Sequence, residues 1–318
     1  MPDPSRSLHR SAPNYSGPAD AGPSIQALLS SFRLTLRAEG LSEKTFNIYA
    51  DAVRRLEAFR LDRGMPPIPS MSTEHIREFL GDMQERNAPS TVNQRYRSLG
   101  RFYKWLVDEG EIRENPMQRI RAPKVPEQIK EHYGTEGLER VLKACGDKTW
   151  TALRDRAMVL VLYDTGVRAS ELCGMRMDDL DMDEQTIKVT GKGGKERLVS
   201  LGSKSALALD KYLRKRPATV ADFVFVSTRG QPLTFNALRM CLRRRFGEAG
   251  VPFKGIHGFR RSFAIAFLDA GGYAEDLQQI AGWNSLQMVQ RYTKATASAR
   301  ARRAHKKLSP ADRLGAKR

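Results

Sequence analysis

Long hydrophobic runs are absent from this sequence. No stretch of its 318 residues approaches the roughly 18 consecutive apolar residues that are needed to cross a lipid bilayer. The opening segment, MPDPSRSLHRSAPNYSGPADAGP, also lacks the apolar core of a secretory signal peptide. We therefore expect a cytoplasmic protein that has no membrane partner.

Cysteine is scarce, and the common metal and nucleotide motifs are missing. The three cysteines, Cys145, Cys173 and Cys241, are far apart and show no paired metal-ligand spacing. The sequence contains no HExxH pattern. The GKGGK stretch differs from a phosphate-binding P-loop, because its lysines are followed by Gly or Glu and then by a predicted strand. We expect reduced, packed thiols, no metal, no cofactor and no small-molecule substrate.

Acidic residues are too few to balance the basic ones. The chain has 36 Asp and Glu against 54 Lys and Arg, which gives a formal net charge of +18 and a pI of about 10.1. Residues 293–318 hold nine Lys or Arg and one Asp, but residues 24–292 carry a further +10. Because the folded body is basic as well as its end, the charge indicates a polyanionic partner, most simply nucleic acid.

Proline, glycine and hydrophobic periodicity divide the chain. The first 23 residues are rich in Pro, Ser, Gly and Ala and have little apolar surface, so we expect them to be disordered. Helical periodicity then continues until the segment NPMQRIRAPKVPEQIK, residues 115–130, interrupts it with three prolines. The predicted organisation is a disordered segment 1–23, a small helical domain 24–122, a linker 123–130, a larger domain 131–299 and a basic tail 300–318.

The first domain reads as four amphipathic helices. Gly40 ends the first, Ser42 and Ser72 cap the second and third, and Ser90 opens the fourth. Apolar residues of the fourth helix form one stripe, and its basic residues stand largely off that stripe. Such a basic face is either solvated or in contact with phosphates. The residues concerned are Arg95, Arg97, Arg101 and Lys104.

The second domain mixes helices with short strands. A long apolar helix stops at Gly166, and TIKVTGKGGKERLVSL, residues 186–201, reads as a hairpin with Lys192 and Lys195 at its tip. FVFVS, residues 223–227, reads as a further strand. The predicted class is mainly α with a small β-sheet. The helix ALRMCLRRRF, residues 237–246, is a candidate for DNA contact through Arg239, Arg243, Arg244 and Arg245.

Two stretches suggest an anion site. In TGVRASEL, residues 165–172, Arg168 stands at the head of a helix, where it either binds an anion or pairs with Glu171. In HGFRRSF, residues 257–263, His257 and Arg260 are three residues apart and therefore share a helix face.

A third stretch, SLQMVQRY, residues 285–292, ends on a tyrosine. Tyr292 lies one turn beyond Val289 and nine residues after Trp283 in AGWNS. At this spacing a tyrosine either closes the core of the last helix or serves as a nucleophile.

Taken together, these stretches resemble the tyrosine recombinase, or phage integrase, family. TGVRASEL resembles its first arginine box, IKVTGKGGKERLVSLG its hairpin with the catalytic lysine, HGFRRSFA its His-x-x-Arg box, and AGWNSLQMVQRYTK its closing motif. The preceding helical region resembles the family's SAM-like core-binding domain. Two positions depart from the common pattern, since Phe259 and Arg261 replace Leu and His of the box His-x-Leu-Arg-His, and Trp283 replaces a histidine.

The resemblance implies a site-specific DNA recombinase, Xer-like or Cre-like, that acts on double-stranded target sites as a homotetramer on two duplexes. Such enzymes form a 3′-phosphotyrosyl intermediate and exchange strands through a Holliday junction. The two arginines would clamp the phosphate, Lys192 would protonate the leaving oxygen, His257 would assist the nucleophile Tyr292, and Trp283 would donate a hydrogen bond. The implied catalytic set is Arg168, Lys192, His257, Arg260, Trp283 and Tyr292.

Two other functions remain open from the sequence. A type IB topoisomerase uses a similar set of residues but relaxes a single duplex. An architectural protein would bind DNA through the same fold without cutting it.

Overall fold

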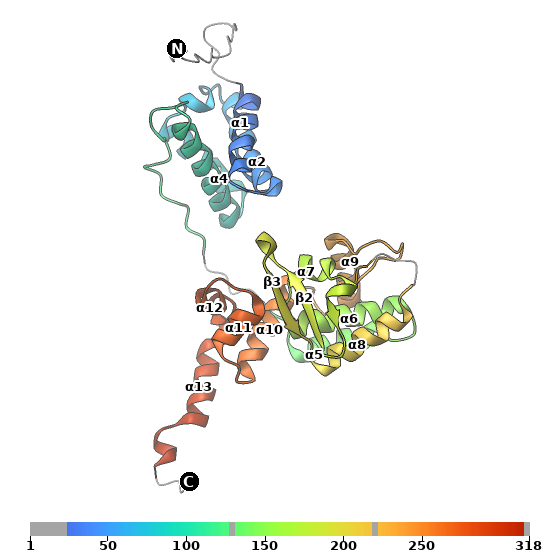
Figure 1. Cartoon of the computed structure of the whole chain (residues 1–318). Coiled ribbons are helices and arrows are strands. Elements are labelled where there is room, and N and C mark those ends of the chain that lie inside the picture. Colours follow the sequence, from blue (N-terminus) through green and yellow to red (C-terminus); the bar gives the residue numbers. More distant parts are fainter. Residues whose placement is uncertain (1–23, 127–130, 218–221, 315–318) are drawn as a thin grey trace, which may run out of the picture. The chain divides into compact units, whose positions relative to one another are not determined.

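The chain forms two compact units, Met1–Gln128 and Ile129–Arg318 (Figure 1). Both consist mainly of helices, so the predicted class is confirmed. The disorder expected at the start of the chain and the last residues of the predicted tail lie outside what the structure describes. The computed structural model describes residues 24–126, 131–217 and 222–314, with the backbone alone at residues 192, 291, 295 and 313.

Side-chain caps start the first two helices of the N-terminal unit. The hydroxyl of Ser24 accepts from the Ala27 N–H at 3.2 Å, and that of Ser42 accepts from the Thr45 N–H at 3.3 Å. The buried faces meet around the aromatic rings of Phe32, Phe102 and Trp105, whose centroids lie 5.1–5.5 Å apart. The helices are α1 (Ile25–Ala38), α2 (Glu43–Asp62), α3 (Thr73–Arg86) and α4 (Pro89–Asp108).

Helix α4 starts one residue earlier than the sequence suggested. Its first residue is Pro89 and its cap is Ala88, which makes no side-chain hydrogen bond. Proline suits the first helical position because its fixed φ is helical and its missing N–H would have no intrahelical partner there. The prediction that Ser90 opens this helix was therefore wrong by one residue.

The C-terminal unit contains the remaining elements. Among the described residues, no helix is both long and apolar enough to cross a membrane. The helices are α5 (Thr135–Cys145), α6 (Trp150–Thr165), α7 (Ala169–Gly174), α8 (Ser203–Lys215), α9 (Phe235–Glu248), α10 (His257–Asp269), α11 (Ala274–Ala281), α12 (Leu286–Thr293) and α13 (Ala297–Leu308), and the strands are β1 (Leu180–Asp181), β2 (Thr186–Thr190) and β3 (Glu196–Ser200).

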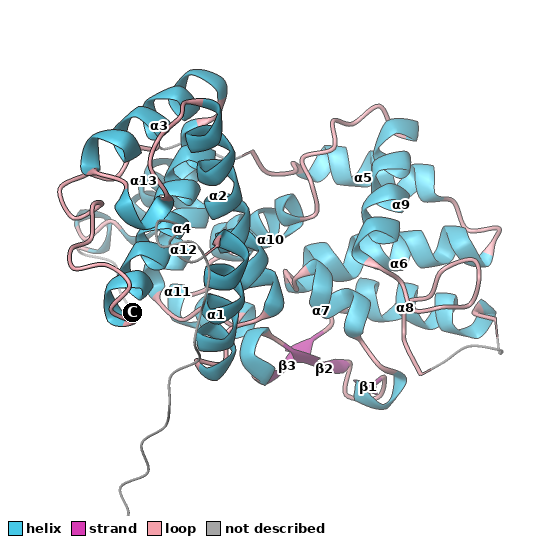
Figure 2. Cartoon of the chain, turned by 90° about the horizontal axis from the view of Figure 1, so that it is seen from above, coloured by secondary structure: helices cyan, strands magenta, loops and turns pink. Residues whose placement is uncertain are grey.

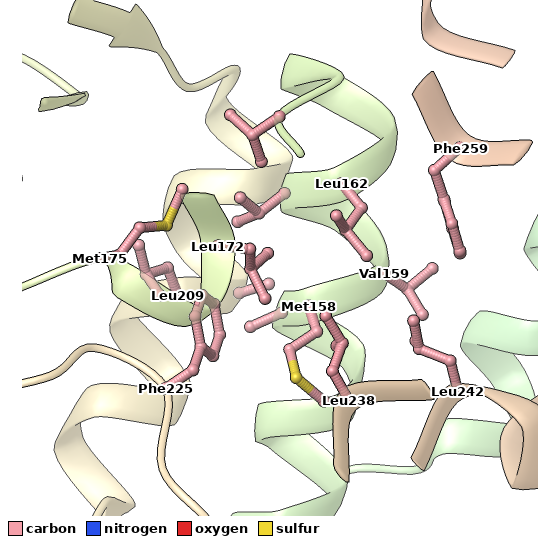
Figure 3. Packing of buried hydrophobic residues seen from close by; sticks show 14 of the residues in the cluster. Met158, Val159, Leu162, Leu172, Met175, Leu209, Phe225, Leu238, Leu242 and Phe259 are labelled. Carbon is pink, nitrogen blue, oxygen red and sulfur yellow. The ribbon is translucent and has the colours of Figure 1, made fainter. Parts of the chain in front are cut away.

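Helix α6 is the centre of this unit. It packs against α5, α8, α9 and α10, and most of its residues are buried. Figure 3 shows Met158, Val159 and Leu162 of α6 among apolar side chains from α7, α8, α9 and α10. A helix that is buried on nearly all sides holds the elements around it at fixed positions. The loops at its C-terminal end are therefore well placed to carry a rigid site.

The three strands form an antiparallel sheet in the order β1-β2-β3, which contacts α7 (Figure 2). The predicted hairpin is confirmed, with Val189 opposite Arg197. The predicted strand at 223–227 was wrong: Phe223 and Val226 form only isolated bridges, to different partners. The run is apolar because residues 224–226 are buried, and its two ends pair with two separate short segments.

Gly166 permits the turn between α6 and α7. Its φ is +59°, and a Cβ at this position would lie 2.3 Å from the ring of Phe263. We expect Gly166→Ala to lower the free energy of unfolding by about 2–4 kcal/mol, because overpacking adds to the cost of a left-handed backbone. Urea denaturation measures the change. Gly174→Ala is the control, since no atom lies within 4 Å of its added methyl, and an equal loss in both variants would contradict the argument.

Candidate active site

Arg168 lies at the corner between α6 and α7. It is the N-cap residue of α7, and its backbone N–H donates to Glu171 Oε2 at 2.8 Å. Its guanidinium donates to Glu171 Oε1 at 2.6 Å and to the carbonyl of Gly282 at 3.4 Å. The side chain remains 36% exposed. The ion pair that the sequence left open is thus present, and the guanidinium still reaches solvent, where an anion can approach it.

Glu171 is the buried counter-ion of this corner. Its side chain is fully buried, and its two oxygens accept from Arg197 at 3.0 and 2.8 Å in addition to Arg168. Burial raises the pKa of the carboxyl, but the hydrogen bonds from Arg197 and Arg168 outweigh burial and lower the pKa to about 2. Glu171 therefore stays ionised and fixes both arginines.

The lowered pKa predicts a pH effect on stability. A carboxyl with a depressed folded-state pKa stabilises the fold above its unfolded pKa of 4.5 and loses that contribution as pH falls toward 2. We expect the stability difference between the unaltered chain and Glu171→Gln to shrink by about 3 kcal/mol between pH 6 and pH 2. Urea denaturation across this range measures it, and a constant difference would contradict the assignment.

Arg260 is a buried arginine whose guanidinium contacts backbone carbonyls and an aromatic ring. It is 1% exposed, and its Nη1 donates to the Gly166 carbonyl at 2.5 Å while its Nη2 donates to the carbonyl of Ala281. Its guanidinium carbon lies 4.9 Å from the centre of the Trp283 ring, and its buried Nε has no partner among the described residues. Burial and the neighbouring charge of Arg168 lower its pKa to about 10. It remains charged at neutral pH.

Three successive residues, 281–283, bring Arg168, Arg260 and Tyr292 together. Arg260 and Arg168 bind the consecutive carbonyls of residues 281 and 282, at the C-terminal end of α11. The next residue, Trp283, stacks on Tyr292, with the ring centres 4.8 Å apart and the planes 11° apart. The side chains of Arg168, Arg260 and Tyr292 therefore converge on three successive residues of the chain.

His257 contacts the tyrosine directly. Its Nε2 lies 2.5 Å from the Tyr292 hydroxyl, which is partly exposed. A neutral imidazole with Nε2 unprotonated accepts the phenolic proton in this geometry. The sequence placed His257 and Arg260 on one face of α10, but the environments differ: His257 is exposed, whereas Arg260 is as buried as Phe259.

The β2–β3 hairpin begins beside this cluster. A Cβ added to Gly191 would lie 3.8 Å from Nη1 of Arg168 and 3.4 Å from Oε1 of Glu171. Lys192 follows directly, so its backbone is near the arginines, although its side chain lies outside what the structure describes. Lys195 is exposed at the other end of the tip.

The basic residues of α4 have varied partners in the free protein. Arg95 pairs with Asp51, Arg101 with Glu39, and Lys104 with Asp108. Arg97 is exposed and has no acidic partner within the described part of the chain. Because such pairs are exchangeable at a surface, DNA contact by these four residues stays a prediction.

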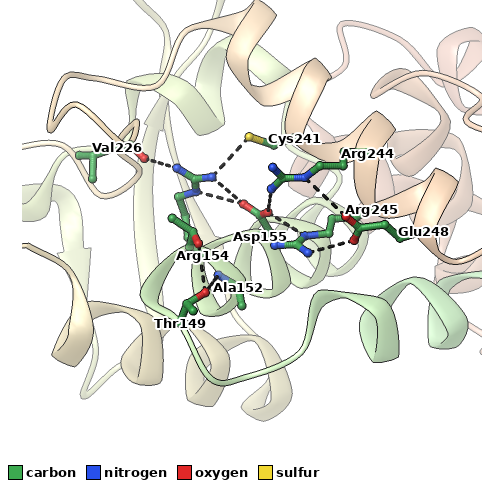
Figure 4. Close-up of polar contacts among 10 residues, drawn as sticks. Thr149, Ala152, Arg154, Asp155, Val226, Cys241, Arg244, Arg245 and Glu248 are labelled. Atoms are coloured by element: carbon green, nitrogen blue, oxygen red, sulfur yellow. Dashed lines mark hydrogen bonds and ion pairs between the residues drawn. The ribbon is translucent and has the colours of Figure 1, made fainter.

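On α9 the basic residues divide into two groups. Arg239 and Arg243 are exposed and make no ion pair with any residue that the structure describes. Arg244 and Arg245 bind the buried Asp155 at 3.3 and 2.9 Å (Figure 4). Arg245 is therefore a structural residue, whereas Arg244 remains exposed beside it, and DNA contact by Arg239, Arg243 and Arg244 stays a prediction.

Asp155 belongs to a polar cluster that the sequence did not reveal. Arg154 is 2% exposed and donates to Asp155, to the carbonyl of Val226 and to the sulfur of Cys241 (Figure 4). The other partners of Arg154 and Asp155 lie on α9 and at residue 226, far along the chain. No local sequence pattern therefore indicates this cluster. The cluster ties α6 to α9 and to the segment before residue 227.

The site combines a phenol, an imidazole and two arginines, and no cluster of metal-ligating side chains occurs in the described residues. Arginine pairs suit the non-bridging oxygens of a phosphate, and a phenol supplies a nucleophile. The arrangement brings together the groups that a phosphoryl-transfer site with a tyrosine nucleophile requires.

Comparisons with known proteins agree with this class. The family model for the catalytic domain of the phage integrase family matches residues 131–299, and that for the phage integrase N-terminal SAM-like domain matches residues 28–111. The tyrosine recombinase XerC of Myxococcus xanthus is 32% identical over 283 residues, covering 86% of this chain and 94% of that relative. XerD of Listeria monocytogenes serotype 4b is 31% identical over 267 residues, covering 81% and 90%.

Solved structures share the fold. XerH bound to a palindromic difH substrate in a post-cleavage complex has a TM-score of 0.71 at 20% identity, covering 91% of this chain and 85% of that one. A lambda integrase tetramer bound to a Holliday junction has a TM-score of 0.68 at 19% identity, covering 86% and 78%. The chain belongs to the phage integrase family of tyrosine recombinases and is a site-specific DNA recombinase.

Proposed function

We propose that Tyr292 attacks a DNA phosphodiester that Arg168 and Arg260 hold. The observation that carries this proposal is the convergence of the three side chains on residues 281–283. A phosphodiester is an anion and resists attack by an oxygen nucleophile, so two guanidinium groups that neutralise its non-bridging oxygens lower the barrier.

In the proposed step the bond from Tyr292 Oη to phosphorus forms as the bond from phosphorus to the 5′ oxygen breaks. His257 accepts the phenolic proton, which the 2.5 Å contact supports. Lys192 donates a proton to the 5′ oxygen, and the products are a 3′-phosphotyrosyl enzyme and a free 5′ hydroxyl. Trp283 packs against both Tyr292 and Arg260, so its role here is to hold them.

The covalent bond conserves the energy of the cleaved phosphodiester. A 5′ hydroxyl from a second duplex can therefore attack it and rejoin the strands without ATP, metal or cofactor. This chemistry supports integration, excision or resolution through a Holliday junction. We propose that four copies act on two duplexes in the cytoplasm, at the nucleoid, and that the basic segment that includes α13 contacts a neighbouring copy.

The structure of α13 fits that role. In the described part of the chain α13 has no buried residue, and Arg303 pairs with Asp269 at 2.7 Å on the surface. An exposed helix held by a surface ion pair separates from its own unit at little cost. Native gels of the chain without residues 300–318 test the contact, because the proposal expects binding to persist and two-duplex complexes to be lost.

Strand exchange is the experiment that tests the function. A duplex retained by the Tyr292→Phe variant from a random-sequence pool supplies a site, and two differently labelled copies of it are incubated with the unaltered chain. We expect recombinant duplexes and Holliday junctions. Relaxation of supercoiled DNA without exchange would favour a type IB topoisomerase, and binding without cleavage would favour an architectural protein.

A further inference from the structure

Arg197 is a second arginine on the buried Glu171. It lies within the hairpin motif, but the resemblance assigns it no role. It lies on β3, two residues before the buried Val199, so both face inward. Its Nη1 and Nη2 donate to the two carboxylate oxygens of Glu171 at 3.0 and 2.8 Å. Its Nε donates to the carbonyl of Ile280 at 3.0 Å. The side chain therefore connects β3, α7 and the end of α11.

These contacts make Arg197 a poor ligand for DNA and a good anchor. All three of its nitrogens donate to protein partners, whereas the Nε of Arg260 has none among the described residues. The planar fork of arginine matches the carboxylate of Glu171 in two parallel hydrogen bonds, which a lysine cannot form. Since Glu171 is fully buried, breaking the ion pair between Arg197 and Glu171 costs considerable free energy.

The anchored strand leads straight to the hairpin tip. Arg197 stands opposite Val189, and the tip is closed by the Gly191 N–H, which donates to the carbonyl of Lys195 at 2.7 Å. Lys192 lies within this closed tip. The tip is solvent-exposed at residues 193–196, so its own packing supports it little. The position of the hairpin tip relative to Arg168 therefore depends on strands β2 and β3, which carry the tip.

On the basis of the proposed function, we propose that Arg197 is a positioning residue for the leaving-group proton transfer. Its bonds to Glu171 and Ile280 hold the β2–β3 hairpin against the arginine site, so that the ammonium of Lys192 is delivered to the 5′ oxygen. In that step the bond from phosphorus to the 5′ oxygen breaks, and the proton passes from the Lys192 nitrogen to that oxygen. Arg197 itself contacts neither DNA nor Tyr292.

A leaving group that needs no proton separates this role from a structural one. A DNA strand with sulfur in place of the bridging 5′ oxygen leaves as a thiolate, because a thiol has a pKa of about 8.5, far below that of an alcohol. The substrates are nicked duplexes of the selected site, with oxygen or sulfur at the mapped cleavage position, and covalent attachment is followed on denaturing gels.

We expect Arg197→Gln to slow attachment to the oxygen substrate by about 100-fold or more, the size of a general-acid contribution, and to approach the rate of the unaltered chain within about threefold on the sulfur substrate. Arg197→Lys keeps the charge but loses the fork, so it is expected to be slowed by about 10-fold and rescued in the same way. Rescue by sulfur also shows that the variant is folded.

The controls distinguish the alternatives. Arg214→Gln removes an exposed arginine that pairs with Asp210 on its own helix, and it is expected to leave both rates unchanged. Arg168→Ala is expected to stay slow on both substrates. An Arg197→Gln variant that is equally slow on both, or unimpaired on the oxygen substrate, would overturn the inference. If the unaltered chain attaches to neither substrate, the proposed function itself fails.

Discussion

A Tyr292→Phe variant is expected to lose covalent attachment to DNA by at least about 10⁴-fold, because the nucleophile is gone and no other group takes its place. DNA binding is expected to persist within about threefold. The ring still stacks on Trp283, and the loss of the hydrogen bond between the Tyr292 hydroxyl and the exposed His257 lowers the free energy of unfolding by only about 1 kcal/mol. Attachment to a nicked duplex is measured on denaturing gels, and binding on native gels.

The matched control is Tyr273→Phe. Tyr273 precedes α11, is 73% exposed and, in the described part of the chain, makes no side-chain hydrogen bond with Arg168 or Arg260. This variant is expected to keep full attachment. Residual attachment by the Tyr292→Phe chain, or loss in the Tyr273→Phe chain, would assign the nucleophile elsewhere.

An Arg260→Lys variant is expected to lose about 10³-fold in attachment rate at neutral pH. Arg260 binds the carbonyls of Gly166 and Ala281 through two separate nitrogens, and a lysine, with a single ammonium nitrogen, cannot reproduce this planar fork. A lysine at this position would also lose its positive charge at a lower pH than arginine, because the ordinary pKa of lysine is lower. Burial and the neighbouring charge of Arg168 lower the pKa of Arg260 to about 10, and the same surroundings would lower the pKa of a lysine below its ordinary value.

This difference gives the prediction a pH signature. A base is charged below its pKa, so the residual activity of the Arg260→Lys chain is expected to fall at a lower pH than that of the unaltered chain, whose Arg260 has a pKa of about 10. Arg214→Lys, on an exposed surface, is the control and should follow the unaltered chain. Parallel pH profiles for all three chains would contradict this account of Arg260.

Local patterns were sufficient for much of the fold. The helix stop at Gly166 and the hairpin are decided by backbone preferences and alternation within a few residues, and the structure contains both. The run at 223–227 misled the prediction, because a continuous apolar segment shows burial but not a pairing partner. The start of α4 was missed because Pro89 outweighs Ser90 at that position.

The candidate site was predicted through the resemblance to a family, and the geometry adds what motifs do not contain. The carbonyls of residues 281 and 282 are backbone atoms, so no residue type signals that they orient Arg260 and Arg168. The alternation of β3 places Arg197 on the inward face together with Val199, although charged side chains are mostly exposed to solvent. Only the fold reveals that its partner is the buried Glu171.

Mass spectrometry of the DNA-linked peptide tests the central claim most directly. The unaltered chain is trapped on a nicked duplex, digested with nuclease and protease, and the peptide that retains a nucleotide is sequenced. The account predicts a single nucleotide-bearing residue, Tyr292, joined to a 3′ phosphate. A nucleotide on any other residue, or one joined through a 5′ phosphate, would contradict it.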